Sequence, residues 1–280
     1  MLDWGAPRLR DLPWRHTRDA WAVLVAEVML QQTQALRVVP KWSAFIDRFP
    51  TPAACADASL GDVLREWHGL GYPRRARHLH DTASTVVEHH GGHVPDDLAS
   101  LIALPGIGPY TARAVLAFAF ARDVAVVDTN IARTLARTAG ARLTPTQVQR
   151  LADALVPPAD GWRWNQTLMD LGATTCRPTP HCADCPAKAW CEWHRSGHPH
   201  PDPAKGSAAV STRQPRFEGS NRQARGRILR RLVEGAAPES AFDAEILEGL
   251  LTDGLIVRTS DTVHLPETER GRPGDPGPSR

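Results

Sequence analysis

The chain has 280 residues, of which 42% are hydrophobic and 23% charged, and its formal net charge at pH 7 is +2. This length allows one sizeable domain and a small one, and the low net charge argues neither for nor against a nucleic-acid partner. The longest apolar run, at 22–30, is interrupted by Glu27, so no segment is long enough to span a membrane. We therefore expect a soluble, cytoplasmic protein with no membrane partner.

Most of the chain is predicted to be helical. Apolar residues recur at helical spacing from Trp21 to about Phe120, interrupted by short loops rich in proline and glycine. Three further helices are predicted at 131–139, 147–155 and 165–172. Long alternation of β-branched residues is absent, which favours a mainly α-helical core at 1–197.

The last third of the chain changes character. Residues 198–216 hold several prolines and no apolar periodicity, so 198–220 is predicted to be a linker. Helices are expected at 221–234 and 243–253, and 254–265 alternates like a β-hairpin around Ser260 and Asp261. This order predicts a small winged-helix-like module at 221–266. The tail at 267–280, rich in proline, glycine and arginine, is expected to be disordered.

Glu27 lies in the run Val23–Leu30, which is apolar on nearly every helical face. Burial would raise the pKa of its carboxyl and keep the group protonated, which suits a general acid. A structural glutamate that is hydrogen-bonded to a neighbouring backbone group remains an equal alternative.

The segment Leu104–Val115 places Gly106 and Gly108 between two predicted helices. Glycines leave backbone N–H groups uncovered, and the start of the next helix carries partial positive charge. Such a turn can bind a DNA phosphate without reading the base sequence. A lone G-x-G is usually only a turn, but the flanking Leu-Pro and Thr-Ala favour a hairpin between helices.

Asp128 follows the run Val124–Val127 and precedes a predicted helix. Aspartate is a favoured N-cap, and capping alone would explain the residue. The same position stabilises an ionised carboxylate. A protonated acid paired with an anionic carboxylate is the combination that breaks a glycosidic bond.

Four of the five cysteines lie within sixteen residues, in the pattern C-x5-C-x2-C-x5-C: Cys176, Cys182, Cys185 and Cys191. Disulfides fit poorly, because no signal peptide is present and Cys55 has no partner. The cluster predicts a tetrathiolate metal centre that holds an iron–sulfur cluster or zinc.

Several motifs occur together and in order. They are Leu12–Arg15, Glu27–Gln34, Gly69–Tyr72, the turn at 104–111, Val127–Asn130, Met169–Ala173 and the cysteine cluster. In this combination the chain closely resembles the A/G-specific adenine DNA glycosylases of the helix-hairpin-helix superfamily over about residues 8–195. The resemblance implies a two-lobed helix-hairpin-helix core with a [4Fe-4S] cluster loop, zinc being the alternative metal. It also implies base-excision repair of double-stranded DNA that contains adenine opposite 8-oxoguanine or guanine, by a chromosome-associated enzyme taken to be monomeric.

The resemblance assigns catalytic roles to individual residues. Glu27 would protonate adenine at N7, Asp128 would stabilise the oxocarbenium-like sugar or attack it transiently, and Asn130 would orient that side of the site. Tyr110 stands where lyase-type relatives carry a lysine, so no Schiff base can form there and a monofunctional glycosylase is expected.

The resemblance also implies DNA contacts. Adenine must leave the base stack to be reached, and wedge residues fill the gap beside the opposing base. The resemblance also implies contacts from an adenine pocket and from the hairpin turn. The matching positions of all these groups are Arg10, Leu12, Trp14, Leu30, Gln31, Gln32, Thr33, Tyr72, Gly106, Gly108, Thr111, Gln166 and Met169. Leu12, Leu30 and Met169 could instead be plain core residues, and a tryptophan such as Trp14 is more often a packing residue than a base contact.

The chain departs from the family pattern at three places. The first cysteine interval is x5 where x6 is usual, which leaves zinc or partial occupancy open for the cluster. Pro73 replaces a second tyrosine and should stiffen its loop. About 45 residues after Asn221 are too few for the family's usual C-terminal domain, so weaker discrimination between 8-oxoguanine and guanine is expected, while the arginines at 222–231 are candidates to grip duplex DNA.

Other functions remain open from the sequence. A thymine or uracil mismatch glycosylase of the same superfamily could share the tyrosine, the aspartate and the cluster. A bifunctional lyase is disfavoured by Tyr110. A non-catalytic DNA-binding protein could use the hairpin, the cluster and the terminal module only to hold DNA.

Overall fold

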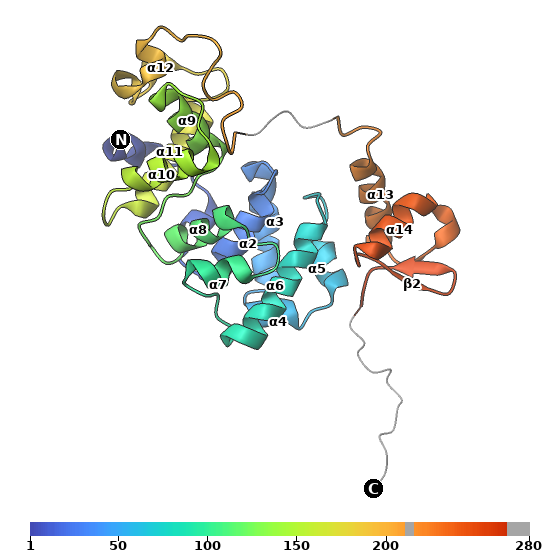
Figure 1. Cartoon of the computed structure of the whole chain (residues 1–280). Coiled ribbons are helices and arrows are strands. Elements are labelled where there is room, and N and C mark those ends of the chain that lie inside the picture. The colour runs from blue at the N-terminus through green and yellow to red at the C-terminus, as the bar shows by residue number, and fades with distance from the viewer. Residues whose placement is uncertain (211–215, 268–280) are drawn as a thin grey trace. The chain divides into compact units, whose positions relative to one another are not determined.

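The computed structural model describes residues 1–210 and 216–267 (Figure 1). It divides into two compact units, each built from separated stretches of the chain. Among the described residues, unit 1 comprises 1–27, 96–103 and 107–210, and unit 2 comprises 28–95, 104–106 and 216–267. No helix among the described residues is long and apolar enough to cross a membrane.

Unit 1 is helical. Its elements are α1 (Leu2–Gly5), η1 (Ala6–Arg8), η2 (Pro13–Arg15), most of α2 (Ala20–Leu30), α7 (Leu98–Ala103), α8 (Pro109–Phe118), α9 (Thr129–Ala139), α10 (Pro145–Leu155), α11 (Gly161–Thr174), η3 (Cys182–Asp184), η4 (Lys188–Trp190) and α12 (Glu192–Arg195). Local sequence sets the main boundaries: Asp128 caps α9, Thr144 and Gln147 form a capping box on α10, and Gly140 ends α9 in the left-handed conformation.

Helices α9 and α11 pack closely beside one another. A Cβ added at Gly172 of α11 would lie 2.5 Å from the Cβ of Asn130, so only glycine permits this approach. This contact brings α11 against the first turn of α9, where Asp128 and Asn130 lie. The predicted helices at 131–139, 147–155 and 165–172 correspond to α9, α10 and α11.

Unit 2 contains two groups of elements. The first comprises α3 (Ala35–Arg48), α4 (Pro52–Ala56), α5 (Leu60–Trp67) and α6 (Arg74–His90). The second comprises α13 (Asn221–Val233), β1 (Ala237–Pro238), η5 (Glu239–Ala241), α14 (Ala244–Thr252), β2 (Val257–Thr259) and β3 (Thr262–His264). The three strands form an antiparallel sheet in the order β1-β3-β2, with Arg258 opposite Val263.

The mainly helical fold class and the small sheet-containing module agree with the sequence prediction. The predicted hairpin forms, and Ser260 at its turn has a φ of 52°. The strand β1 and the turn η5 were not predicted, because two residues are too few to show a period. The predicted domain limits stay predictions, and the predicted disordered tail at 267–280 lies, except for Glu267, outside the described residues.

Part of the predicted linker, residues 198–210, belongs to unit 1. The carboxylate of Asp202 pairs with Arg137 at 2.6 Å, the Ala208 N–H donates to the Leu143 carbonyl at 2.9 Å, and Ala204 is buried. Prolines and small residues therefore form an ordered segment here, although they show no periodicity.

Candidate active site and metal centre

Glu27 is buried, with 5% of its surface exposed near the end of the apolar helix α2. The hydroxyl of Tyr110, in the first turn of α8, donates a hydrogen bond to Glu27 Oε2 at 3.0 Å. Burial raises the pKa of Glu27 to about 7, while the Tyr110 hydrogen bond opposes that rise and the negative charge of Asp128 adds to it. This carboxyl can therefore hold a proton near neutral pH and release it to a bound group.

Asp128 caps α9 as the sequence predicts. Its Oδ1 accepts the backbone N–H groups of Asn130 and Ile131 at 3.0 and 2.7 Å, and its Oδ2 accepts the Asn130 side-chain amide at 2.8 Å. Burial raises the pKa of Asp128, and these donors together with the charge of Arg133 oppose the rise. Asp128 accepts three hydrogen bonds, which favour its ionised form. Glu27 accepts a hydrogen bond from the neutral Tyr110 hydroxyl, which favours ionisation less strongly.

Arg133 connects this carboxylate with the cysteine loop. Its Nη2 donates to Asn130 Oδ1 and to the Gly172 carbonyl, both at 2.7 Å, and its Nε donates to the Cys176 carbonyl at 2.7 Å. The orientation of the Asn130 amide, and through it that of Asp128, is thus fixed by a buried guanidinium. Sequence reasoning missed Arg133, although it lies one helical turn after Asn130.

Asp170 holds the N-terminal segment against α11. This buried carboxylate binds Arg15 at 2.7 and 3.0 Å, and Arg10 through its backbone N–H at 2.9 Å and its Nε at 2.6 Å. The two guanidinium groups lower the pKa of Asp170 despite its burial. Of the predicted adenine-pocket positions in this region, Leu12, Trp14, Gln166 and Met169 are buried.

The predicted hairpin forms between α7 and α8. Gly106 has a φ of +72°, and a Cβ there would lie 2.7 Å from His78, so the turn requires glycine. Gly108 is exposed and precedes Pro109, the first residue of α8, which suits a backbone that faces a phosphate. Thr111 is buried in the first turn of α8.

In unit 2, a buried arginine joins two loops that carry the remaining predicted DNA contacts. Arg75 donates to the carbonyls of Met29 and Gln31 at 3.0 and 2.7 Å and to the Gly71 carbonyl at 3.1 Å. It also donates to the Thr33 hydroxyl at 3.2 Å. Of the predicted positions in these loops, Leu30, Gln31, Thr33 and Tyr72 are half-buried and Gln32 is exposed.

The basic residues Arg74, Arg75 and Arg77 do not all face the solvent, because Arg75 is only 9% exposed. Its guanidinium lies over the rings of Trp67 and Tyr72, at 5.2 and 5.4 Å from their centroids. Burial lowers its pKa to about 10, so it remains charged at neutral pH. A run of three basic residues gave no signal that one of them faces inward.

The four clustered cysteines line one hollow in unit 1 together with Trp193 and His194. None of the five cysteines of the chain is in a disulfide. Arg137 is 2% exposed, donates to the Cys176 sulfur at 3.4 Å and the Arg177 carbonyl at 2.7 Å, and pairs with Asp202. All four clustered thiols therefore line the same hollow, and a buried cation lies beside them.

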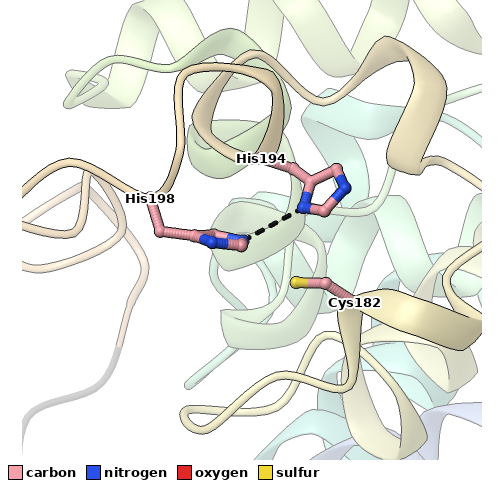
Figure 2. Close-up of side chains that lie close together, drawn as sticks. All are labelled: Cys182, His194 and His198. Carbon is pink, nitrogen blue, oxygen red and sulfur yellow. Dashed lines mark hydrogen bonds between the residues drawn. The ribbon is translucent and has the colours of Figure 1, made fainter.

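Two histidines that were not predicted lie beside this hollow. Figure 2 shows the rings of His194 and His198 joined by a hydrogen bond of 3.1 Å, with the Cys182 sulfur pointing toward them. Among the described residues, these three form the only group of three or more potential metal ligands whose ligand atoms all lie within 4.8 Å of one another. This group could hold a metal ion.

The fold and site define the class of protein. Residues 25–158 match the model of the HhH-GPD superfamily of base excision DNA repair proteins. A solved structure of a thermostable thymine-DNA glycosylase aligns with a TM-score of 0.65 and 29% identity, over 70% of this chain and 93% of the other.

Two curated relatives narrow the class further. The adenine DNA glycosylase of Mycobacterium tuberculosis is 41% identical over 93% of this chain and 90% of its own length. That of Mycolicibacterium smegmatis is 40% identical over 98% of this chain and 97% of its own length. The chain belongs to the adenine DNA glycosylase family, and it is a DNA-binding glycosylase of base-excision repair.

Proposed function

We propose that this enzyme hydrolyses the N-glycosidic bond of adenine paired with 8-oxoguanine or guanine, without cleaving the DNA strand itself. The observation that carries the proposal is the buried Glu27, whose pKa is raised to about 7 beside the hydroxyl of Tyr110 and within reach of the charge of Asp128. The relatives named adenine DNA glycosylase support adenine as the base.

Glu27 acts as the general acid. A carboxyl with a pKa near 7 is protonated in a large fraction of molecules at neutral pH and can give its proton to adenine N7, which makes the base a neutral leaving group. General-acid catalysis of this kind contributes about 10²- to 10⁴-fold in rate. Tyr110 holds the carboxyl in place through its hydroxyl and offers no amine for a Schiff base.

Asp128 carries the negative charge opposite the developing sugar cation. Its three hydrogen-bond donors fix both of its oxygens and stabilise the ionised form, so the anion is in place before the C–N bond lengthens. Asn130 orients it through the side-chain amide. Water then adds to C1′ of the sugar and gives its proton to the ionised Glu27 carboxylate, which restores the acid for the next cycle.

The remaining predicted contacts divide between the two units. In unit 1, Arg10, Leu12, Trp14, Gln166 and Met169 form the adenine pocket, while Gly108 and Thr111 belong to the phosphate-binding hairpin, to which Gly106 contributes from the turn. In unit 2, Gln31, Gln32, Thr33 and Tyr72 belong to the loops that enter the duplex beside the opposing purine, while Leu30, the last residue of α2, is an adenine-pocket position. Gln32 and Tyr72 have φ values of 56° and 49°, a conformation that non-glycine residues hold only when the surroundings impose it.

The four cysteines hold a [4Fe-4S] cluster. Tetrahedral zinc with Zn–S bonds of about 2.3 Å places its thiolates about 3.8 Å apart. No three of these four sulfurs lie mutually within 4.8 Å, so their spacing suits a wider, multinuclear group. When bound, the cluster would cross-link residues 176–191 into one rigid loop, and it takes no part in hydrolysis.

The test is base release from duplexes that contain A:8-oxoguanine, A:G, T:G and U:G, using protein whose iron and zinc have been counted. Each reaction is developed with and without alkali. We expect adenine release that becomes strand scission only after alkali, and losses of about 10²- to 10⁴-fold for Glu27→Gln and Asp128→Asn. An exposed substitution, Glu88→Gln, is the control.

Activity confined to T:G or U:G would instead assign the pyrimidine mismatch function, which the likeness to the thymine-DNA glycosylase structure makes the second candidate. Strand scission without alkali would overturn the monofunctional mechanism. A wild-type protein without activity on any duplex, together with Glu27→Gln and Asp128→Asn variants that bind mismatched DNA as tightly as wild type, would indicate a non-catalytic DNA-binding protein.

A further inference from the structure

A pocket of about 460 Å³ lies within unit 2 where three segments meet. The loop after α2 contributes Gln31 and Gln32, the start of α6 and the residues before it contribute Tyr72–Arg75 and His78, and α13 contributes Arg222 and Arg225. The C-terminal module thus supplies two arginines to a pocket whose other wall is formed by the predicted wedge loops.

The lining of this pocket is strongly cationic. Four arginines line it, and no acidic side chain among the described residues does. Asp253, just outside the lining, pairs with Arg74 and Arg225. One carboxylate cannot neutralise four guanidinium groups, so the pocket attracts an anion.

Arg222 is held at this pocket by aromatic contacts. Its Nη1 donates to the Tyr72 hydroxyl at 2.7 Å, and its guanidinium carbon lies 5.8 Å from the ring centroids of both Tyr72 and Phe217. A stacked guanidinium loses little further freedom when it binds, which suits recognition of a planar fork of oxygens or a phosphate. Tyr72 therefore connects α13 to a loop that the proposed function places beside the opposing base.

We propose that this pocket binds a backbone phosphate of the strand opposite the excised adenine, and that Arg222 is the contact supplied by the C-terminal module. The inference rests on the proposed function for the identity of the strand. Phosphate is favoured over a base edge because the lining carries an excess of positive charge, which includes the guanidinium groups of Arg222 and Arg225 from α13. The module would therefore strengthen DNA binding for every base pair, and it would not read the oxidised base.

The experiment measures the Kd of the full-length protein for a duplex with a central A:8-oxoguanine pair and for the same duplex with A:G. In both, the adenosine carries a 2′-fluorine, which prevents cleavage by destabilising the sugar cation. Binding is followed across a range of NaCl concentrations for wild type, Arg222→Ala and Arg222→Lys. Arg150→Ala is the control for a lost surface charge, because Arg150 is an exposed arginine of α10 and does not line the pocket.

We expect Arg222→Ala to weaken binding to both duplexes equally, by about tenfold at moderate salt, and to reduce the slope of log Kd against log salt by about 1. Arg222→Lys should keep the wild-type slope, because a lysine retains the charge. Arg150→Ala should change the slope by less than half as much as Arg222→Ala does. Thermal melting of each variant establishes that it is folded.

An unchanged slope in folded Arg222→Ala protein would overturn the phosphate assignment. A loss confined to the 8-oxoguanine duplex would also overturn it, because it would show that Arg222 reads the base. Base release from an unmodified A:8-oxoguanine duplex separates the two proposals: wild type that excises no adenine, yet shows the slope change in Arg222→Ala, would refute the proposed function and leave the phosphate site standing.

Discussion

At the scale of single residues, the same burial that adapts Glu27 to acid catalysis should make it costly to the fold. Its folded-state pKa of about 7 lies above the ordinary value of 4.5. Below pH 4.5 the carboxyl is protonated in both states and no cost arises. Between pH 4.5 and 7 the unfolded chain loses its proton first, so stability falls as pH rises, and the cost is complete above pH 7.

Glu27→Gln should therefore be more stable than wild type at pH 8, by about 3 kcal/mol in the free energy of unfolding, and should match it near pH 4. Glutamine keeps the shape and can still accept the Tyr110 hydroxyl. Urea unfolding at several pH values measures the difference. Glu88→Gln, which removes an exposed charge, should show no such pH-dependent gain, and a Glu27→Gln protein equal to wild type at pH 8 would contradict the assigned pKa.

At the scale of elements, Arg75 links two segments of the chain by donating side-chain hydrogen bonds to their backbone carbonyls. It binds the carbonyls at the end of α2 and those of 70–71, which lie some forty residues apart in the sequence. A charged donor can satisfy several carbonyls at once, and removing it leaves them buried without a partner. The loops with Gln32 and Tyr72 should then lose their fixed positions.

Arg75→Met should lower the free energy of unfolding by about 3 kcal/mol and weaken binding to the cleavage-resistant A:8-oxoguanine duplex by more than tenfold. The methionine retains much of the aliphatic volume, so the change removes the guanidinium, with its hydrogen bonds and ring contacts, and leaves most of the packing. Arg150→Met, an exposed substitution on α10, serves as the control for a lost charge. Retention of full affinity by Arg75→Met would show that the wedge loops hold their shape without it.

The sequence predicts interactions that are local and misses those that are distant. The cap of Asp128 on α9 was predictable because its partners lie two and three residues ahead. The burial of Glu27 was predictable because its own helix is apolar on every face. The partners of Asp170 lie 155 and 160 residues away, and those of Arg75 are mainly carbonyls, which no residue type reveals.

At the scale of the whole molecule, the two units interleave along the chain. Residues 216–267 belong to the same compact unit as 28–95, although more than a hundred residues of unit 1 separate them in sequence. Several polar contacts attach the module within unit 2, in addition to the hydrogen bond from Arg222 to the Tyr72 hydroxyl. Asp253 pairs with Arg74 of α6 and Arg225 of α13, its carbonyl accepts Arg77, and the Gly61 N–H donates to the Pro266 carbonyl at 2.7 Å.

The Asp253 carboxylate is 7% exposed, and the guanidinium groups of Arg74 and Arg225 lower its pKa. Because it contacts α6 and α13 at once, it is the contact on which the module's docking should depend most. Asp253→Asn keeps the shape but removes the charge, which should cost about 1.5 kcal/mol of docking free energy. The Gly61 amide reports this directly, because its acceptor belongs to the module. Its hydrogen exchange should become about tenfold faster.

Asp261→Asn is the matched control, since Asp261 is exposed at the turn between β2 and β3 and uses only its carbonyl, toward Glu239. It should leave Gly61 exchange unchanged. If Asp253→Asn also left the exchange of the Gly61 amide unchanged, docking would depend on apolar packing alone.

Arg222 belongs to the module, so weaker docking of the module should also make the position of Arg222 at the phosphate pocket less fixed. Asp253→Asn should therefore weaken DNA binding although it removes a negative charge, an outcome opposite in sign to simple electrostatics.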